Sequence, residues 1–201
     1  VLQSRGLGDV YKRQSRYMDD KFRPAFEMEL EAMRSVKEDF GLDNLQLMVP
    51  FCRTPEEGEM VTDLLNQKGI GPDSGTDLFV MVELPSNVIE ADRFIELMGL
   101  SGGSIGSNDL VQTVYAVSRD DLEGYQNPID ARSPSVKSMI RQIVGKFNSR
   151  GLEIGICGQA PSDFPDEFPP FLIDCGITSI SVTPDTAVAV RATVAEAERK
   201  S

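Results

Sequence analysis

The sequence predicts an α/β fold built on parallel strands. Two observations lead to this prediction: short apolar runs alternate with longer stretches of helical periodicity, and several of the helical stretches end at a glycine. Five strand-then-helix units follow one another, an order that right-handed crossovers between parallel strands satisfy. Doubly wound sheets and (β/α)₈ barrels both fit this order, so the pattern leaves the architecture open.

The first unit shows the pattern most clearly. An amphipathic helix is expected from Asp20 to about Phe40, and Gly41 is expected to end it. The run LQLMVP at 45–50 predicts a strand. Thr54 then precedes a proline and, three residues later, a glutamate, which is the capping-box pattern of a helix N-terminus.

The other four units repeat this order. A polar loop is expected at about 118–133, before the fourth unit's helix, which Ser133 begins and Gly151 ends. The expected strands are 78–84, 104–110, 153–159 and 177–185, and the expected helices are 85–98, a short stretch after 110, 133–151 and the segment from Thr186.

Composition narrows the class of protein. The chain has 201 residues, 40% hydrophobic and 26% charged, which is typical of one soluble globular domain. Its net charge of −12 disfavours nucleic acids and anionic membranes as partners, and no apolar run approaches the roughly 20 residues of a membrane span. A cytoplasmic location is expected, and the three cysteines, with no C-x-x-C pair, fit a reducing compartment.

The sequence contains no histidine. This excludes Ser-His-Asp triads, Cys-His dyads and His-based zinc sites from the chain. Acid–base or metal chemistry must therefore come from carboxylates, amides, lysines or a thiol.

Residues 1–14 differ from the rest. They show neither helical nor strand periodicity and carry three basic groups against one acidic group. We expect them to be an unrelated leader, artefactual or disordered, in front of a domain that covers residues 15–201.

Reactive groups are expected at the carboxyl ends of the strands, where the strand-to-helix loops converge. Glu83 and Asp109 stand at two of these ends, and two carboxylates of this kind suit Mg²⁺. The alternative is that Asp109 caps the next helix and Glu83 pairs with a basic residue.

Cys157 and Arg53 stand at two further strand ends. Cys157 precedes a glycine that permits close ligand approach, so its thiol is either a general acid or a small buried apolar group. Arg53 either binds an anionic ligand or pairs with Glu56 or Glu57. We expect Cys175, before a helix-ending glycine, to be structural.

Several motifs at these strand ends resemble the phosphoenolpyruvate-utilising enzymes, and among them the phosphoenolpyruvate synthases. The matching stretches are SRYMDDKFRPAFEMELEAMRSV, LMVPFCRTPEE, VMVELPSN, SIGSNDL, IGICGQAPSD and ISVTPD, which together cover the chain from about Ser15 to its end. SIGSNDL and ICGQAPSD are the most specific of them.

The resemblance implies the C-terminal five β/α units of a (β/α)₈ TIM barrel, truncated at its N-terminus. It implies that Glu83 and Asp109 hold Mg²⁺ and that Cys157 gives a proton to, or takes one from, the substrate carbon. This chemistry needs a cation across the two oxygens of an enolate and a proton donor over its carbon face. It also implies that pyruvate or phosphoenolpyruvate is bound by Asn108, Ser107, Arg53 and Gln159.

In this family a histidine on a separate domain is phosphorylated from ATP and delivers its phosphoryl group to the barrel. The resemblance therefore implies partners within the same parent enzyme, namely phosphohistidine and nucleotide-binding domains. The intact reaction would convert pyruvate, ATP and water into phosphoenolpyruvate, AMP and phosphate. This chain would hold the acceptor site alone and be inactive in the full reaction.

The sequence also departs from the family pattern. SGGS replaces DGFS, SNDLVQTVYAVSRD replaces SNDLTQLTLGVDRD, and Thr183 replaces an asparagine, which bears on fine specificity. Pyruvate, phosphate dikinases and the phosphotransferase-system enzyme I share the carboxylate motifs but carry CGE where this chain has CGQ. The remaining alternatives are a non-catalytic half-barrel that pairs with itself as a homo-oligomer or with a partner, and a class II aldolase-like lyase.

Overall fold

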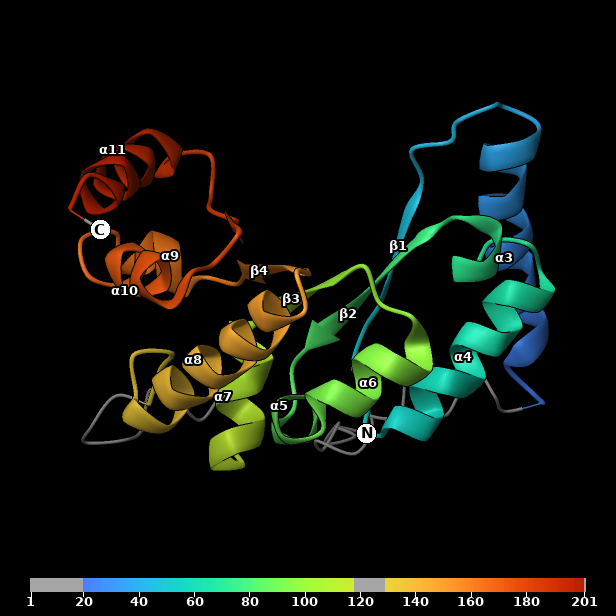
Figure 1. Cartoon of the computed structure of the whole chain (residues 1–201), viewed down its shortest axis with the longest axis horizontal. Coiled ribbons are helices and arrows are strands. Elements are labelled where there is room, and N and C mark those ends of the chain that lie inside the picture. The colour runs from blue at the N-terminus through green and yellow to red at the C-terminus, as the bar shows by residue number, and fades with distance from the viewer. Residues whose placement is uncertain (1–19, 118–128, 201) are drawn as a thin grey trace, which may run out of the picture. The chain divides into compact units, whose positions relative to one another are not determined.

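The computed structural model describes residues 20–117 and 129–200 (Figure 1). The expected leader at 1–14 and residues 118–128 of the expected polar loop lie outside the described residues. The helices are α3 (Arg23–Glu38), α4 (Pro55–Gln67), the 3₁₀ turn η1 (Pro72–Ser74), α5 (Pro85–Ile89), α6 (Ala91–Met98), α7 (Ser107–Tyr115), α8 (Pro134–Ser149), α9 (Ala160–Asp163), α10 (Phe168–Cys175) and α11 (Ala187–Glu198). The strands are β1 (Gln46–Val49), β2 (Asp77–Val82), β3 (Gly102–Gly106), β4 (Glu153–Cys157) and β5 (Ser179–Ile180).

The strands form one sheet in the order β1-β2-β3-β4-β5. β1 pairs with β2, β3 with β4 and β4 with β5, each in parallel. A doubly wound sheet reverses its strand order at a switch point, whereas this order simply follows the sequence. The α/β prediction is thus confirmed, and the topology is consistent with a TIM-type fold. Membership of an eight-stranded barrel stays a prediction.

The described residues divide into two compact units. The first unit consists of the described residues up to Val80 and of Asp92–Ser101. The second unit consists of Met81–Ala91 and of the described residues from Gly102 onward. The core of the first unit comes from α3, α4, α6 and the first two strands. Its most deeply buried side chains include Leu30, Val61, Leu64, Leu78, Val80, Phe94 and Met98.

The core of the second unit is organised around α8. Five apolar side chains at helical spacing, each 1% exposed or less, form one stripe along it: Val136, Ile140, Ile143, Val144 and Phe147. This helix contacts β3 and β4. Gly103 in β3 makes room for it, because a Cβ there would lie 3.0 Å from the Phe147 ring. The helix begins after Ser133 and Gly151 follows its end in a left-handed conformation, as the sequence predicts.

Three predicted boundaries are wrong. The helix expected at 85–98 is two helices, because the chain turns at Glu90, where the ammonium group of Lys146 binds the last carbonyls of α5. Residues 107–110, expected to finish a strand, form the first turn of α7. The strand expected at 177–185 is reduced to Ser179–Ile180.

Other local predictions are confirmed. Gly41 adopts a left-handed φ of 66° just beyond α3. Thr54 is the N-cap of α4, and its hydroxyl accepts a hydrogen bond of 3.2 Å from the backbone N–H of Glu57. The Glu57 carboxylate reaches back to the N–H of Arg53 at 3.0 Å rather than to that of Thr54. Within the described residues no helix is long and apolar enough to cross a membrane.

The N-cap of α4 gives a stability prediction. Thr54→Ala leaves the Glu57 N–H without its acceptor and should lower the free energy of unfolding by about 1 kcal/mol, measured by urea denaturation. Thr193→Ala is the control, since the Thr193 hydroxyl lies inside α11 and bonds to the Ala189 carbonyl. Equal losses in the two variants would contradict the role of Thr54 as a cap.

Candidate functional site

The end of β2 holds Glu83 in a fixed position. The side-chain oxygen of Asn87 accepts hydrogen bonds from the backbone N–H groups of Glu83 at 3.1 Å and Leu84 at 3.0 Å. The Glu83 carbonyl accepts a further bond of 2.8 Å from the Thr113 hydroxyl of α7. Glu83 is 8% exposed, so its backbone is anchored on both sides and its carboxylate lies in a largely enclosed place.

Gly106 makes room for the Glu83 side chain. A Cβ at Gly106, the last residue of β3, would lie 2.6 Å from Glu83 Cγ and 2.8 Å from Glu83 Oε1. Real Cβ atoms do not approach other atoms so closely, so a larger residue here would displace the carboxylate. Gly106 also pairs with Cys157 in the register of β3 and β4. Glu83 and Cys157 therefore both neighbour this one glycine.

The end of β4 is tied to the first turn of α7. The Ser107 hydroxyl, fully buried, donates a hydrogen bond of 2.9 Å to the Cys157 carbonyl. The Gln159 N–H donates to the side-chain oxygen of Asn108 at 3.4 Å. Between them Gly158 has φ 112°, and a Cβ there would lie 2.2 Å from the Ser107 oxygen. A glycine is required for both reasons.

The environment of Cys157 keeps its thiol protonated. Burial raises the thiol pKa above its ordinary value of 9.0, a hydrogen bond with the Ser104 side chain lowers it, and the negative charges of Glu83 and Asp109 raise it further. The net shift is upward. At neutral pH the group is therefore a neutral thiol, able to donate a proton.

Asp109 does not cap α7. Gly106 is the N-cap residue, and as a glycine it makes no side-chain cap hydrogen bond. The Asp109 carboxylate lies instead in the first turn, where the helix dipole favours negative charge. The capping interpretation of Asp109 is therefore wrong.

Glu83 and Asp109 supply the type of ligand that Mg²⁺ prefers. Both offer hard carboxylate oxygens, and Mg²⁺ commonly takes one or two carboxylates together with water and substrate oxygens. No group of three or more His, Cys, Asp or Glu side chains suited to a metal is found among residues 20–117 and 129–200. Two carboxylates alone would leave coordination positions of Mg²⁺ for water and substrate oxygens.

Arg53 belongs to the other compact unit. Its guanidinium pairs with the Glu57 carboxylate at 3.5 Å, while Glu56 pairs with Arg93. The expected pairing of Arg53 with a nearby glutamate is confirmed for Glu57. A contact between Arg53 and substrate stays a prediction.

Chain comparisons identify the family. A family model described as the PEP-binding domain of PEP-utilising enzymes matches residues 12–199. This chain belongs to the PEP-utilising enzyme family. The match includes both strand ends with carboxylates, Glu83 and Asp109, and the Cys157 strand end.

The PEP-utilising relatives include several phosphoenolpyruvate synthases. Those of Aquifex aeolicus and Synechocystis are 44% and 42% identical, each over 92% of this chain. That of Escherichia coli is 36% identical over 99% of this chain. The chain spans 21% of the length of the Aquifex protein, 22% of the Synechocystis protein and 24% of the Escherichia protein.

Two solved structures share the fold of this PEP-utilising domain. A citrate lyase from Burkholderia xenovorans aligns with a TM-score of 0.57 and 14% identity, over 74% of this chain and 48% of that one. RipC from Yersinia pestis aligns with a TM-score of 0.56 and 12% identity, over 82% of this chain and 70% of that one. At these identities the likeness concerns the fold alone.

Three site features were missed by sequence reasoning. Ser104 hydrogen-bonds the Cys157 thiol, Gly106 gives Glu83 its space, and Asn87 fixes the Glu83 backbone. Asn87 and Gly106 both lie inside the motifs VELPSN and SIGSNDL, so the motif matches contained a signal for them. Nothing in the sequence pairs Ser104 with Cys157.

The cysteines should differ in reactivity. Burial raises the pKa of Cys52, which is 0% exposed, to about 12, whereas Cys157 and Cys175 are partly exposed. Burial also raises the pKa of Cys157 and of Cys175, so all three thiols should react slowly, but the reagent can reach only the two partly exposed ones. Iodoacetamide at pH 8 should therefore modify Cys157 and Cys175 in the native chain and leave Cys52 intact until urea unfolds it. Mass spectrometry of peptides reads the three sites separately. Modification of Cys52 at the rate of Cys175 would contradict its burial.

Proposed function

We propose that this chain carries an acceptor site at which a phosphoryl group is exchanged with pyruvate and phosphoenolpyruvate. The observation that carries the proposal is the meeting of a protonated thiol, Cys157, with two carboxylates, Glu83 and Asp109, at neighbouring strand ends. Relatives named phosphoenolpyruvate synthase favour the synthase reaction over those of the dikinases, enzyme I and an aldolase-like lyase. The full reaction of those longer proteins is part of the proposal.

Glu83 and Asp109 would hold Mg²⁺ in this proposal. The cation would stabilise negative charge that develops on the oxygens of enolpyruvate. Asn108 and Gln159 present polar groups beside the same site, and the hydrogen bonds of Ser107 and Gln159 hold the β4 end close to α7. Their role would be to orient the substrate and to exclude water.

Cys157 would move the proton. When phosphoenolpyruvate passes its phosphoryl group to a histidine of another domain, the thiol would give its proton to the methylene carbon of the resulting enolate, which becomes the methyl group of pyruvate. In the opposite direction the thiol would first lose its proton to solvent, and the thiolate would then take a methyl proton and return to the thiol. A raised thiol pKa suits donation, because the neutral thiol is the resting form; in the opposite direction it lowers the thiolate fraction but makes each thiolate a stronger base.

The phosphoryl donor would lie outside this chain. Phosphohistidine is the donor that the family resemblance implies, and the chain contains no histidine. An ATP-driven reaction would therefore need domains that belong to a longer enzyme. We propose that the chain supplies the half of the reaction that takes place on pyruvate, and that it works in the cytoplasm.

Calorimetric titration with oxalate, a planar mimic of enolpyruvate, tests the site. The chain should bind oxalate only with Mg²⁺ present, and Glu83→Gln or Asp109→Asn should weaken binding by at least about tenfold, since even outer-shell partners of metal ligands are worth about that. Glu59→Gln, an exposed carboxylate on α4, is the matched control and should bind like the unmodified chain. Mg²⁺-independent binding, or a loss as large in Glu59→Gln, would refute the proposed site.

The proton-transfer role of Cys157 is tested without the phosphoryl donor. In D₂O with Mg²⁺, the chain should exchange the methyl protons of pyruvate, followed by proton NMR. Cys157→Ala should slow this exchange by about 10²-fold or more. Oxalate binding should be unchanged in this variant, because oxalate has no methyl or methylene carbon and its binding involves no proton transfer to carbon. Cys175→Ala is the control. Exchange at the same rate in Cys157→Ala would remove the thiol from the chemistry.

A further inference from the structure

A pocket of about 290 Å³ lies beside the proposed substrate-binding residues. Its walls come from three segments of the second unit: α7, the segment just before α8, and the region of α9. Among the residues that line it are Asn108, Gln112, Asp130, Gln159 and Phe164. Two of these, Asn108 and Gln159, are also proposed to bind substrate. The width of the pocket therefore sets how far apart these two substrate-binding residues lie.

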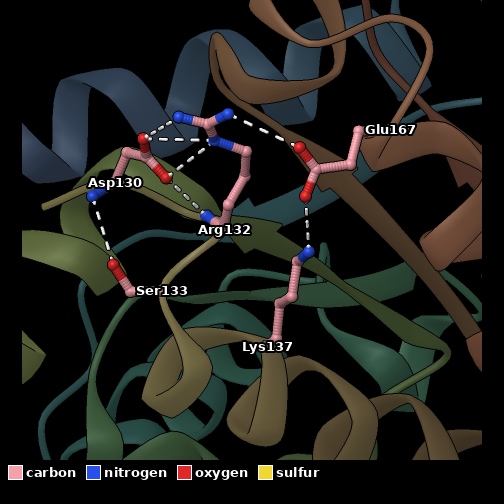
Figure 2. Close-up of polar contacts among 5 residues, drawn as sticks. All are labelled: Asp130, Arg132, Ser133, Lys137 and Glu167. Carbon is pink, nitrogen blue, oxygen red and sulfur yellow. Dashed lines mark hydrogen bonds and ion pairs between the residues drawn. The ribbon is translucent and has the colours of Figure 1, made fainter. Parts of the chain in front are cut away.

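Arg132 is anchored to one wall of this pocket. Its guanidinium binds the Asp130 carboxylate through Nε at 3.2 Å and Nη2 at 2.8 Å, and its backbone N–H donates to the same carboxylate at 2.7 Å. The Asp130 N–H and the Ser133 hydroxyl are 3.3 Å apart in a further hydrogen bond (Figure 2). The side chain of Arg132 is thus oriented by its own turn.

The same guanidinium also contacts a second lining residue of the pocket, Phe164. Its central carbon lies 3.6 Å from the centroid of the Phe164 ring, which is a cation–π contact. Its Nη1 is 3.4 Å from Glu167, whose other oxygen accepts a bond of 2.9 Å from Lys137 of α8 (Figure 2). Arg132 therefore joins the segment before α8 to the turn between α9 and α10.

That turn is coupled to Gln159 through the backbone of α9. The N–H of Phe164 bonds to the Ala160 carbonyl at 3.0 Å, and the N–H of Asp163 bonds to the Gln159 carbonyl at 2.9 Å. Gln159 in turn donates to Asn108. A shift of the Phe164 ring would thus be transmitted through one short helix to the residues beside the candidate site.

The network is charged at neutral pH. Burial tends to raise the pKa of Asp130, but the hydrogen bonds and charge of Arg132, together with the charge of Lys137, lower it overall. The hydrogen bond from Lys137 lowers the pKa of Glu167. Both carboxylates are therefore ionised, and the guanidinium is shared between two anions and one aromatic ring.

We propose that Arg132 is a positioning residue that clamps the α9 segment, and with it Gln159, at the distance from α7 that the substrate requires. This inference rests on the proposed function, because Gln159 matters only if the ligand binds beside it. Arg132 acts through Asp130, Phe164 and Glu167 and does not contact the substrate. It leaves the pair Glu83 and Asp109 untouched, so the affinity for the cation and the affinity for the organic ligand should respond separately.

Arg132→Met tests the clamp, because methionine keeps an apolar side chain against Phe164 and removes the forked ion pair. In calorimetry the affinity for Mg²⁺ should stay unchanged, while the affinity for oxalate in the presence of Mg²⁺ should fall by about tenfold. A loss of this size is expected if Gln159 is displaced from the ligand by less than about 1 Å. Arg132→Lys should recover part of this loss, since lysine restores the charge without the fork. Arg141→Met is the matched control: Arg141, on α8, lies over the ring of Phe171 on α10.

Hydrogen exchange of the peptide 158–168 is the second measurement. It should be several-fold faster in Arg132→Met than in Arg141→Met, with the urea midpoint unchanged. Unaltered oxalate affinity in Arg132→Met, equal losses in both methionine variants, or unaltered exchange at 158–168 would each overturn the clamp. Absence of oxalate binding by the unmodified chain would refute the proposed function instead, and the exchange comparison would then decide the clamp without a ligand.

Discussion

The candidate site depends on the close approach of Glu83 to Gly106. The parallel register of β3 and β4 places Gly106 beside Cys157. Because Gly106 has no side chain, the Glu83 side chain can occupy the space beside it without a steric clash. If either strand slipped by one residue, the alternation of side chains would put a larger residue at this point. The sheet register and the position of a carboxylate are therefore one constraint.

A second glycine extends this constraint to α7. Gly158 allows the β4 end to press against Ser107 and Asn108, which begin the helix that also carries Asp109. Two carboxylates then bring negative charge near one thiol, and the charge together with burial keeps that thiol protonated. Close backbone packing thus produces the electrostatic property that proton donation needs.

The sequence predicted the order of elements because the helical periodicities of α3, α4 and α8 and the caps at Thr54 and Ser133 are local signals. It failed where tertiary contacts decide. The helix break at Glu90 is accompanied by hydrogen bonds from a lysine of α8, more than fifty residues away in the sequence. The early end of β5 could not be predicted either, because the strand-like pattern of the sequence continues beyond Ile180. α9, a helix of four residues, was missed, and α10 was anticipated only at its end, where Gly176 terminates it as expected.

The same limit applies to the site. The motifs indicated Glu83, Asp109 and Cys157, since reactive residues at strand ends follow from the parallel fold. They did not indicate the contact of Ser104 with Cys157 or the pairing of Arg132 with Glu167. In each pair the two residues are far apart in the sequence, so no local pattern shows that they meet in the fold. Asp109 as a helix cap was a reasonable local interpretation, but the strand ends at Gly106 and gives that position to the glycine.

The site therefore divides into two parts that are held by different forces. Glu83 and Cys157 are fixed by strand pairing and by backbone hydrogen bonds, which a single exposed substitution does not alter. Gln159 follows the end of β4 and is exposed, so its position depends on α9, a helix of four residues that is too short to be stable by itself. Its stability must come from tertiary contacts. These include the hydrogen bond from the Thr183 N–H to the Ser162 hydroxyl, the contact of Arg132 with the Phe164 ring at its end, and the ion pair of Arg132 with Glu167 just beyond it. A variant without this arginine would therefore keep Glu83 and Cys157 in place, but the position of Gln159 would no longer be fixed.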